Sequence, residues 1–199
     1  YFGSSITVND FPSGSSTLIG HANSAGAAAV GAAFFLETPE YGFDPAQLEP
    51  YSSAGGTPIL FGAGGAPLSA PEVRFKPEFT AIDGVNTTFF FNDSHGNDGI
   101  DDFFGTSAAA PHAAGVAALM LQVDPTLTPA QIKAALVSSA LDMNTPGFDY
   151  DSGYGLIQAD AAIAGLSNPG NLPPTADFSF VSISGLDVAF TDASTDLDG

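Results

Sequence analysis

One stretch of the chain limits the choice of fold more than any other. Residues 107–122 contain no Asp, Glu, Lys or Arg and consist mainly of alanine, glycine and larger apolar residues. A helix that is apolar at every position is typical of one that is buried on all sides. Pro111 is expected near its first turn, where a missing N–H costs least. The sequence therefore predicts a central helix inside a layered domain.

Two further helices are predicted after it. Residues 128–141 open with Thr128 as a helix cap, Pro129 at the first helical position and Gln131 as a capping-box residue. Apolar side chains then recur along one face of this range, which is typical of an amphipathic helix. A shorter helix is expected over residues 157–164.

The region before the central helix contains the strand signals. Residues 25–36 form an unpunctuated run of small and apolar residues, which fits a buried strand or a helix equally well. Residues 87–91, TTFFF, are β-branched and aromatic and favour a strand. Residues 37–71 hold many Gly and Pro residues and are expected to be mostly loop, as is the Asp-rich segment 92–102. Together with the helices, these signals predict an α/β domain.

A change in composition marks a second, shorter unit. Residues 167–174, SNPGNLPP, are typical of a linker. Beyond it, residues 175–199 alternate apolar and polar side chains in two short runs, which predicts a β-hairpin or the start of a sandwich. The expected organisation is thus one domain over 1–166, a linker, and the beginning of an all-β unit. Because the chain opens on Tyr1 and stops at Gly199 in mid-pattern, we expect it to be an internal piece of a longer protein.

The charge balance argues against several classes of partner. The chain carries 3 Lys and Arg against 22 Asp and Glu residues, a formal net charge of −19. Nucleic acids and anionic membranes are bound through basic surfaces, so we expect no nucleic-acid partner. The chain has no Cys, which removes disulfides and Cys-ligated metal sites. No apolar run reaches the roughly 18 residues of a membrane-spanning helix, so no membrane span is expected.

The start of the central helix carries the main chemical signal. Ser107 is expected among unpaired backbone N–H groups at the positive end of the helix dipole, a place that favours an anion. If Ser107 attacks a carbonyl group, its own N–H can stabilise the oxyanion that forms. Gly105 and Ala108 leave room there for a substrate backbone. The alternative is that Ser107 merely caps the helix, which is the commonest role of a serine at such a position.

The sequence around this serine resembles a known family. Residues 105–119, GTSAAAPHAAGVAAL, closely resemble the active-serine motif of the subtilisin-like serine proteases, the subtilases. Four other segments are similar to the family and fall in its order: HANSAGAAAVGA, RFKPEFTAIDGV, DPTLTPAQIKAALVSSA and DSGYGLIQADAA. The resemblance covers about residues 1–166. It departs from the family at Ile82, where the family usually has Pro.

The resemblance implies a fold and a reaction. The fold would be part of a three-layer α/β domain with a parallel sheet. Ser107 would be the nucleophile of a serine endopeptidase, which hydrolyses peptide bonds in protein or peptide substrates through an acyl-enzyme. In the family, the catalytic His and Asp precede the serine, and neither motif occurs in this chain. We therefore expect the 199 residues to be a fragment without useful activity of its own.

The three histidines of the chain are expected to have structural roles. The same holds for two places where the sequence offers a candidate for a catalytic motif of the family. His112 is expected to pack or hydrogen-bond within the helix, His95 to lie at the loop surface, and His21 to occupy a turn. The sequence Asp151-Ser152-Gly153 resembles the family's aspartate motif but follows the serine, so we interpret it as part of a turn. The family's oxyanion-hole asparagine is expected upstream of Tyr1. Asn23 is the only local candidate for that role and is not favoured.

No metal or cofactor site is assigned, but two acidic clusters leave structural calcium open. Oxygen-rich loops can hold Ca²⁺, although a solvated turn is the favoured interpretation of both. The first cluster comprises Asn92, Asp93, Asn97, Asp98, Asp101 and Asp102. The second comprises Asp192, Asp196 and Asp198.

The end of the chain resembles a second family. Residues 173–199 are similar to the first strands of a PKD domain, an Ig-like β-sandwich, but the family's later Trp-Asp-Phe-Gly-Asp segment is absent. A truncated sandwich buries little apolar surface, so loose order is expected there. The acidic composition, the lack of Cys and this module predict an extracellular protein, secreted or at the cell surface.

Two other function classes are alternatives to a protease. One is a non-catalytic surface or adhesion protein on a subtilase-like scaffold. The intact Gly-Thr-Ser sequence argues against it, because a scaffold needs no serine at that helix start. The other is a lipase-like or esterase-like hydrolase, which is disfavoured because the chain has no Gly-x-Ser-x-Gly elbow.

Overall fold

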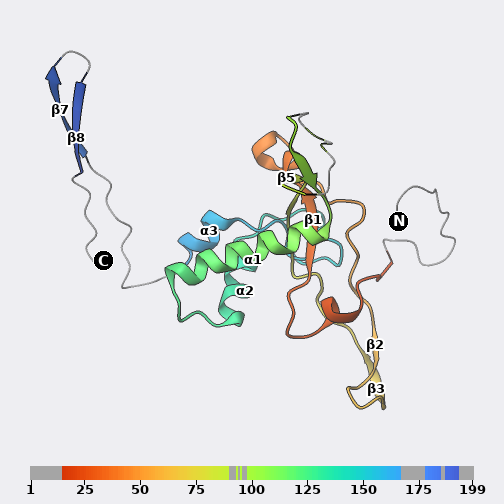
Figure 1. The fold of residues 1–199 in the computed structure, drawn as a ribbon. Helices are drawn as coiled ribbons and strands as arrows, with labels where there is room; N and C mark the ends of the chain where they lie inside the picture. Colours follow the sequence, from red (N-terminus) through yellow and green to blue (C-terminus); the bar gives the residue numbers. More distant parts are fainter. Residues whose placement is uncertain are drawn as a thin grey trace.

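The centre of the molecule is a pair of parallel strands with a long helix beside it (Figure 1). The structure, a computed structural model, describes residues 15–89, 93, 95, 98–166, 178–184 and 187–192. Strand β1, Val30–Phe34, pairs in parallel with β4, Phe79–Asp83, over their full length. A parallel bridge from Thr80 to Leu156 extends this pairing by one further segment. Residues 25–36 fitted a strand or a helix on sequence alone, and the structure has a strand there, at Val30–Phe34.

The two faces of this sheet contact different parts of the chain. Side chains alternate along a strand, so neighbouring residues point to opposite faces. Ala32 and Ala81 belong to a core shared with residues of the three α-helices. Ala33 and Leu156 belong to a second, smaller core on the sheet. Mixed helix and strand content around a parallel pair agrees with the α/β prediction.

Helix α1, Thr106–Val123, forms where the sequence predicted it but is not buried on all sides. Leu119 is 48% exposed and Leu121 is 39% exposed. All-round burial was therefore a wrong prediction for the part of the chain that the structure describes. The reason is that α1 packs against β1, β4 and α3, which cover one face of it. Its buried residues are Ala108, Ala109, Ala113 and Met120.

Each of the two shorter helices agrees with the sequence prediction at one end only: α2 at its start and α3 at its end. Helix α2, Pro129–Ser138, has the predicted capping box between Thr128 and Gln131. It ends at Ser138 rather than near Leu141, because Leu141 forms a two-way backbone bridge with Leu156. Helix α3, Ala159–Ala164, begins two residues later than expected. The later start of α3 has a similar cause, because the Ile157 N–H donates to the Thr80 carbonyl and continues the sheet.

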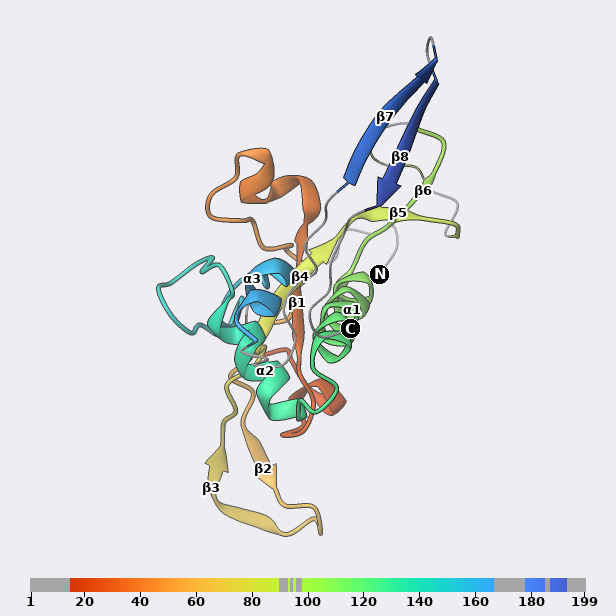
Figure 2. The same ribbon diagram turned by 90° about the vertical axis from the view of Figure 1, so that its left-hand side faces the viewer.

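The loop regions contain more structure than the sequence predicted. Strands β2, Ile59–Phe61, and β3, Pro67–Glu72, form an antiparallel hairpin that projects from the body (Figure 2). Within the described part of the region before the central helix, three short 3₁₀-helices also occur: η1 at Gly20–Asn23, η2 at Phe35–Glu37 and η3 at Pro39–Tyr41. The hairpin was missed because its Gly and Pro residues are typical of a loop.

A second antiparallel hairpin leads into α1. Strand β5, Val85–Thr87, pairs with β6, Asp101–Phe103. The strand predicted at 87–91 was therefore placed too late: β5 ends at Thr87, and Thr88 and Phe89 form a bend. Residues 90–91 lie outside the described residues. The strand ends early because its pairing with β6 ends at the Thr87–Asp101 pair.

The predicted C-terminal hairpin is confirmed. Strand β7, Phe178–Ser184, pairs antiparallel with β8, Asp187–Asp192. The predicted linker, 167–174, lies outside the described residues. Among those that are described, no helix has the length and apolar character needed to cross a membrane.

Candidate active site

Ser107 lies in the first turn of α1, at the end of the β5–β6 hairpin, and its side chain is exposed. The residue before the helix, Gly105, has φ +114° and ψ 159°, a conformation that favours glycine. The Gly105 carbonyl accepts the N–H groups of Ala108, at 2.8 Å, and Ala109, at 3.2 Å. The N–H groups of Thr106 and Ser107 come before these two donors in the chain and are among the donors that a helix start leaves for an external partner. The arrangement suits an oxygen anion beside Ser107.

Strand β4 ends close to this helix start. The Gly84 N–H donates to the Phe103 carbonyl at 2.9 Å, which holds the chain leaving β6 against the end of β4. Phe104 and Gly105 then follow directly into α1. In α/β folds, ligands bind beyond the carboxyl ends of parallel strands. Ser107 therefore lies at the edge of the sheet where ligands bind in such folds.

A buried carboxylate that the sequence did not single out supports this turn. Asp83, the last residue of β4, is fully buried. Its Oδ2 atom accepts the Gly105 N–H at 2.7 Å and the hydroxyl of Tyr51. The available sequence signal was an acidic residue followed by glycine at the end of an apolar strand, and that pattern also fits an ordinary turn.

Burial sets the electrostatics of this group. It raises the pKa of Asp83, while hydrogen bonds from Tyr51 and Gly105 act in the opposite direction. The pKa of Glu49 is also raised, first by burial and then by the negative charge of Asp83. The pKa of Tyr51 is raised by burial and by its hydrogen bond to Asp83. The cluster therefore favours a neutral Tyr51 that donates to an acidic partner.

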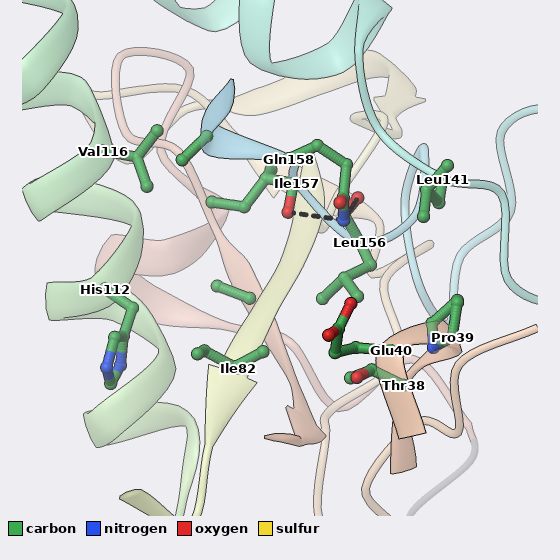
Figure 3. Close-up of a pocket in the computed structure, with 12 residues that line it drawn as sticks. Thr38, Pro39, Glu40, Ile82, His112, Val116, Leu141, Leu156, Ile157 and Gln158 are labelled. Atoms are coloured by element: carbon green, nitrogen blue, oxygen red, sulfur yellow. Dashed lines mark hydrogen bonds between the residues drawn. The ribbon is translucent and has the colours of Figure 1, made fainter. Parts of the chain in front are cut away.

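The structure gives His112 a role within the helix. Its Nδ1 atom lies 2.8 Å from the carbonyl oxygen of Ala108, one turn earlier in α1. Its ring lines a cavity of about 520 Å³ that reaches from α1 across Ile82 to Leu156 and Gln158 (Figure 3). His112 was predicted to pack or to hydrogen-bond within the helix, and the hydrogen bond is confirmed.

His95 lies among aromatic rings. Its ring centroid is 4.2 Å from that of Phe34 and 5.1 Å from that of Phe104. Its backbone N–H donates to Asp102 Oδ2 at 2.7 Å, and its Nδ1 atom lies 3.9 Å from the same oxygen. His95 is thus more integrated in the protein than a surface loop residue, although 37% of its side chain is exposed.

The Asp151-Ser152-Gly153 sequence forms part of a turn, as predicted. Ser152 is buried, and both its N–H and its hydroxyl donate to Asp149 within a tight turn. Gly153 has φ +71°, and a Cβ there would lie 2.5 Å from the backbone of Glu78. Asn23 is buried, and its amide donates to the Thr57 carbonyl at 3.4 Å. His21 lies exposed in η1, in agreement with a turn role.

The first acidic cluster holds its own loop together where it is described. Asp93 accepts the Gly99 N–H at 2.8 Å, and Asp98 accepts the Ile100 N–H at 2.9 Å. No group of three or more His, Asp or Glu residues within the described ranges is arranged to hold a metal ion. Asn92, Asn97, Asp196 and Asp198 lie outside those ranges, so structural calcium stays a prediction.

Comparison with known proteins identifies a family and several relatives that the chain resembles. Residues 9–155 match the subtilase family, peptidase S8. Fervidolysin from Fervidobacterium pennivorans is 49% identical over 70 residues, which are 35% of this chain and 10% of that protein. The minor extracellular protease Epr of Bacillus subtilis is 46% identical over 57 residues, which are 29% of this chain and 9% of Epr.

A solved structure shows the same fold. The crystal structure of fervidolysin, a keratinolytic enzyme related to subtilisin, matches with a TM-score of 0.50 and 25% sequence identity. The match covers 87% of this chain and 26% of the fervidolysin chain. This chain therefore spans about a tenth of the length of those curated relatives and about a quarter of that solved structure. From residue 9 to residue 155, the chain belongs to the subtilase family.

Proposed function

We propose that this chain is the serine-bearing part of a subtilisin-like serine endopeptidase, with Ser107 as its nucleophile. Family membership supports a serine protease that acts on protein substrates. The observation that carries the role of Ser107 is its place in the first turn of α1, beside backbone N–H groups at the edge of the sheet. A merely capping serine would precede the helix, but here Gly105 holds that position.

The proposed reaction is peptide-bond hydrolysis in two steps. The Ser107 hydroxyl attacks the carbonyl carbon of the scissile bond and passes its proton to a base, while the Ser107 N–H donates to the oxyanion. The amine half of the substrate leaves with that proton and an acyl-enzyme forms. Water then attacks the ester, and Ser107 regains its proton. The base and its aspartate partner are proposed to lie in a segment upstream of Tyr1.

The proposed domain organisation follows the composition. Residues 1–166 would be the C-terminal part of the peptidase domain, 167–174 a linker, and 175–199 the beginning of a PKD-like module. Support for the last part is the antiparallel pairing of β7 with β8. We also propose an extracellular location, because related proteins such as Epr carry that description.

The test uses the full-length protein that contains this chain, with an unstructured protein such as casein as substrate. Ser107→Ala is expected to lower kcat on the order of 10⁶-fold, the loss known for subtilisin without its serine. The matched control is Ser138→Ala, because the Ser138 hydroxyl donates to the Ala135 carbonyl in α2. This control should retain wild-type kcat. Equal activity of wild type and Ser107→Ala would refute the proposal and favour a non-catalytic scaffold.

The isolated chain provides a second test. Residues 1–199 alone are expected to hydrolyse no peptide, because one member of the catalytic triad is present without the other two. Hydrolysis by the isolated chain that disappears in Ser107→Ala would show that it contains a complete catalytic set.

A further inference from the structure

We propose that Asp83 is a positioning residue for catalysis: its carboxylate holds the Gly105 N–H and thereby fixes the turn that presents Ser107. This inference rests on the proposed role of Ser107 as the nucleophile. Asp83 would contact neither substrate nor the reacting atoms. Its effect would pass through the backbone of Thr106, which joins Gly105 to Ser107 by two peptide bonds.

The carboxylate itself is firmly placed. Asp83 pairs with Phe34 at the last position of the parallel β1–β4 register and is fully buried. The Tyr51 hydroxyl donates to the same oxygen that accepts the Gly105 N–H. A rigid strand, burial and a second donor limit the movement of this side chain, which is what a positioning residue requires.

The turn at Gly105, which Asp83 holds, is not fixed by steric contacts of its own. Gly105 has φ +114°, and a Cβ there would meet nothing closer than the Ser107 nitrogen at 3.7 Å. Local steric contacts therefore do little to select this conformation, and glycine is the most conformationally free residue. The hydrogen bond to Asp83, at 2.7 Å, supplies the missing restraint.

The neighbouring residue adds a second point of attachment. The Gly84 N–H donates to the Phe103 carbonyl at 2.9 Å. Gly84 has φ +72°, and a Cβ there would lie 2.4 Å from the Phe34 ring, so the backbone fits closely against that ring. Asp83 and Gly84 thus hold the chain on either side of Phe104. Loss of the Asp83 contact frees the end nearer to Ser107.

The inference predicts a specific kinetic pattern in the full-length protein. Asp83→Ala removes the acceptor, and displacement of a catalytic group by about 1 Å can cost about 100-fold in rate. We expect kcat to fall about 10- to 100-fold, with KM within about twofold of wild type. Asp83→Asn retains an acceptor oxygen and should restore kcat to within about threefold of wild type. Rates are normalised to the fraction of Ser107 labelled by a fluorophosphonate.

A matched control separates positioning from stability. Asp149 also accepts backbone N–H groups in a turn, from Thr145, Asp151 and Ser152. Asp149→Ala should therefore lower Tm but leave kcat unchanged. If Asp83→Ala does not fold, Asp83→Leu fills the same space without an acceptor and carries the same expected loss of kcat.

The outcomes distinguish a failure of the positioning role of Asp83 from a failure of the proposed function. If a folded Asp83→Ala or Asp83→Leu protein keeps wild-type kcat and loses only Tm, as expected for Asp149→Ala, the positioning role is overturned. If Asp83→Asn is as slow as Asp83→Ala, the hydrogen-bond acceptor is not the cause and the inference also fails. If wild-type protein takes no label at Ser107, the proposed function itself fails.

Discussion

The buried ion pair between Lys76 and Glu78 allows a quantitative test of the packing. Lys76 Nζ contacts Glu78 Oε1 and the Ala27 carbonyl oxygen, and the two side chains are only 3% and 7% exposed. The second carboxylate oxygen of Glu78 accepts the Ala29 N–H at 2.7 Å. The Glu78 side chain therefore neutralises the buried Lys76 cation and links the segments that lead into β1 and β4.

Glu78→Gln removes the charge and keeps both the size and an oxygen acceptor. Lys76 is then a buried cation without its counter-charge, because the nearby Lys133 is also cationic. Removing one partner of a buried pair costs about 3–5 kcal/mol of unfolding free energy. For a domain of 150–250 residues this corresponds to a fall of roughly 6–20 °C in Tm. Calorimetry of the full-length protein, with Ser107→Ala present to prevent self-digestion, measures the change.

A surface pair on the same segment is the control. Glu72 lies 2.7 Å from Arg74, and these side chains are 50% and 26% exposed. Glu72→Gln should cost less than about 1 kcal/mol, and added salt should weaken that effect more than the effect of Glu78→Gln. Equal losses for the two variants would show that the Lys76–Glu78 pair is not desolvated, and the reasoning would be refuted.

Three other changes have defined expectations. Thr128→Ala removes the capping box with Gln131 and should lower the unfolding free energy by about 1 kcal/mol, measured by denaturant unfolding. Gly155→Ala should be more harmful, because Gly155 has φ +107° and a Cβ there would lie 2.0 Å from the Leu141 oxygen; a soluble variant with wild-type Tm would contradict this. Burial raises the pKa of Asp83 above its ordinary 3.8, so its contribution to stability is present below that pH and is lost as pH rises through the folded pKa. Asp83→Asn should therefore gain stability relative to wild type from below about pH 4 towards neutrality, and a constant difference across that range would contradict the raised pKa.

Features with local causes were predictable from the sequence. The capping box needs only Thr128 and Gln131, which lie within one helical turn of each other, and it formed as expected. The bond from His112 to the carbonyl of the preceding turn is equally local. The placement of Ser107 in the first turn of α1 also follows from a contiguous motif. In each case the partners are close in sequence, so the pattern alone contains the interaction.

Features that depend on distant partners were not predictable in the same way. Residues 25–36 fitted a strand or a helix until β4 supplied a parallel partner, with Glu78 bonding the backbone 49 residues earlier. Helix α2 ended early because Leu141 pairs with Leu156. The Asp83–Gly105 contact joins residues 22 apart, and no spacing rule indicates it. The exposed face of α1 was mispredicted because composition reports what a helix can bury, not what covers it.

The most direct test of the central claim is labelling of the full-length protein with a fluorophosphonate, followed by mass spectrometry of the tryptic or chymotryptic peptides. We predict one phosphonylated residue in this chain, Ser107, and no label on folded Ser107→Ala. Prior heat denaturation should abolish labelling, because the attacking hydroxyl depends on the folded site. Well-folded protein that takes no label, or label on another serine that persists in Ser107→Ala, would contradict the assignment of Ser107 as the nucleophile.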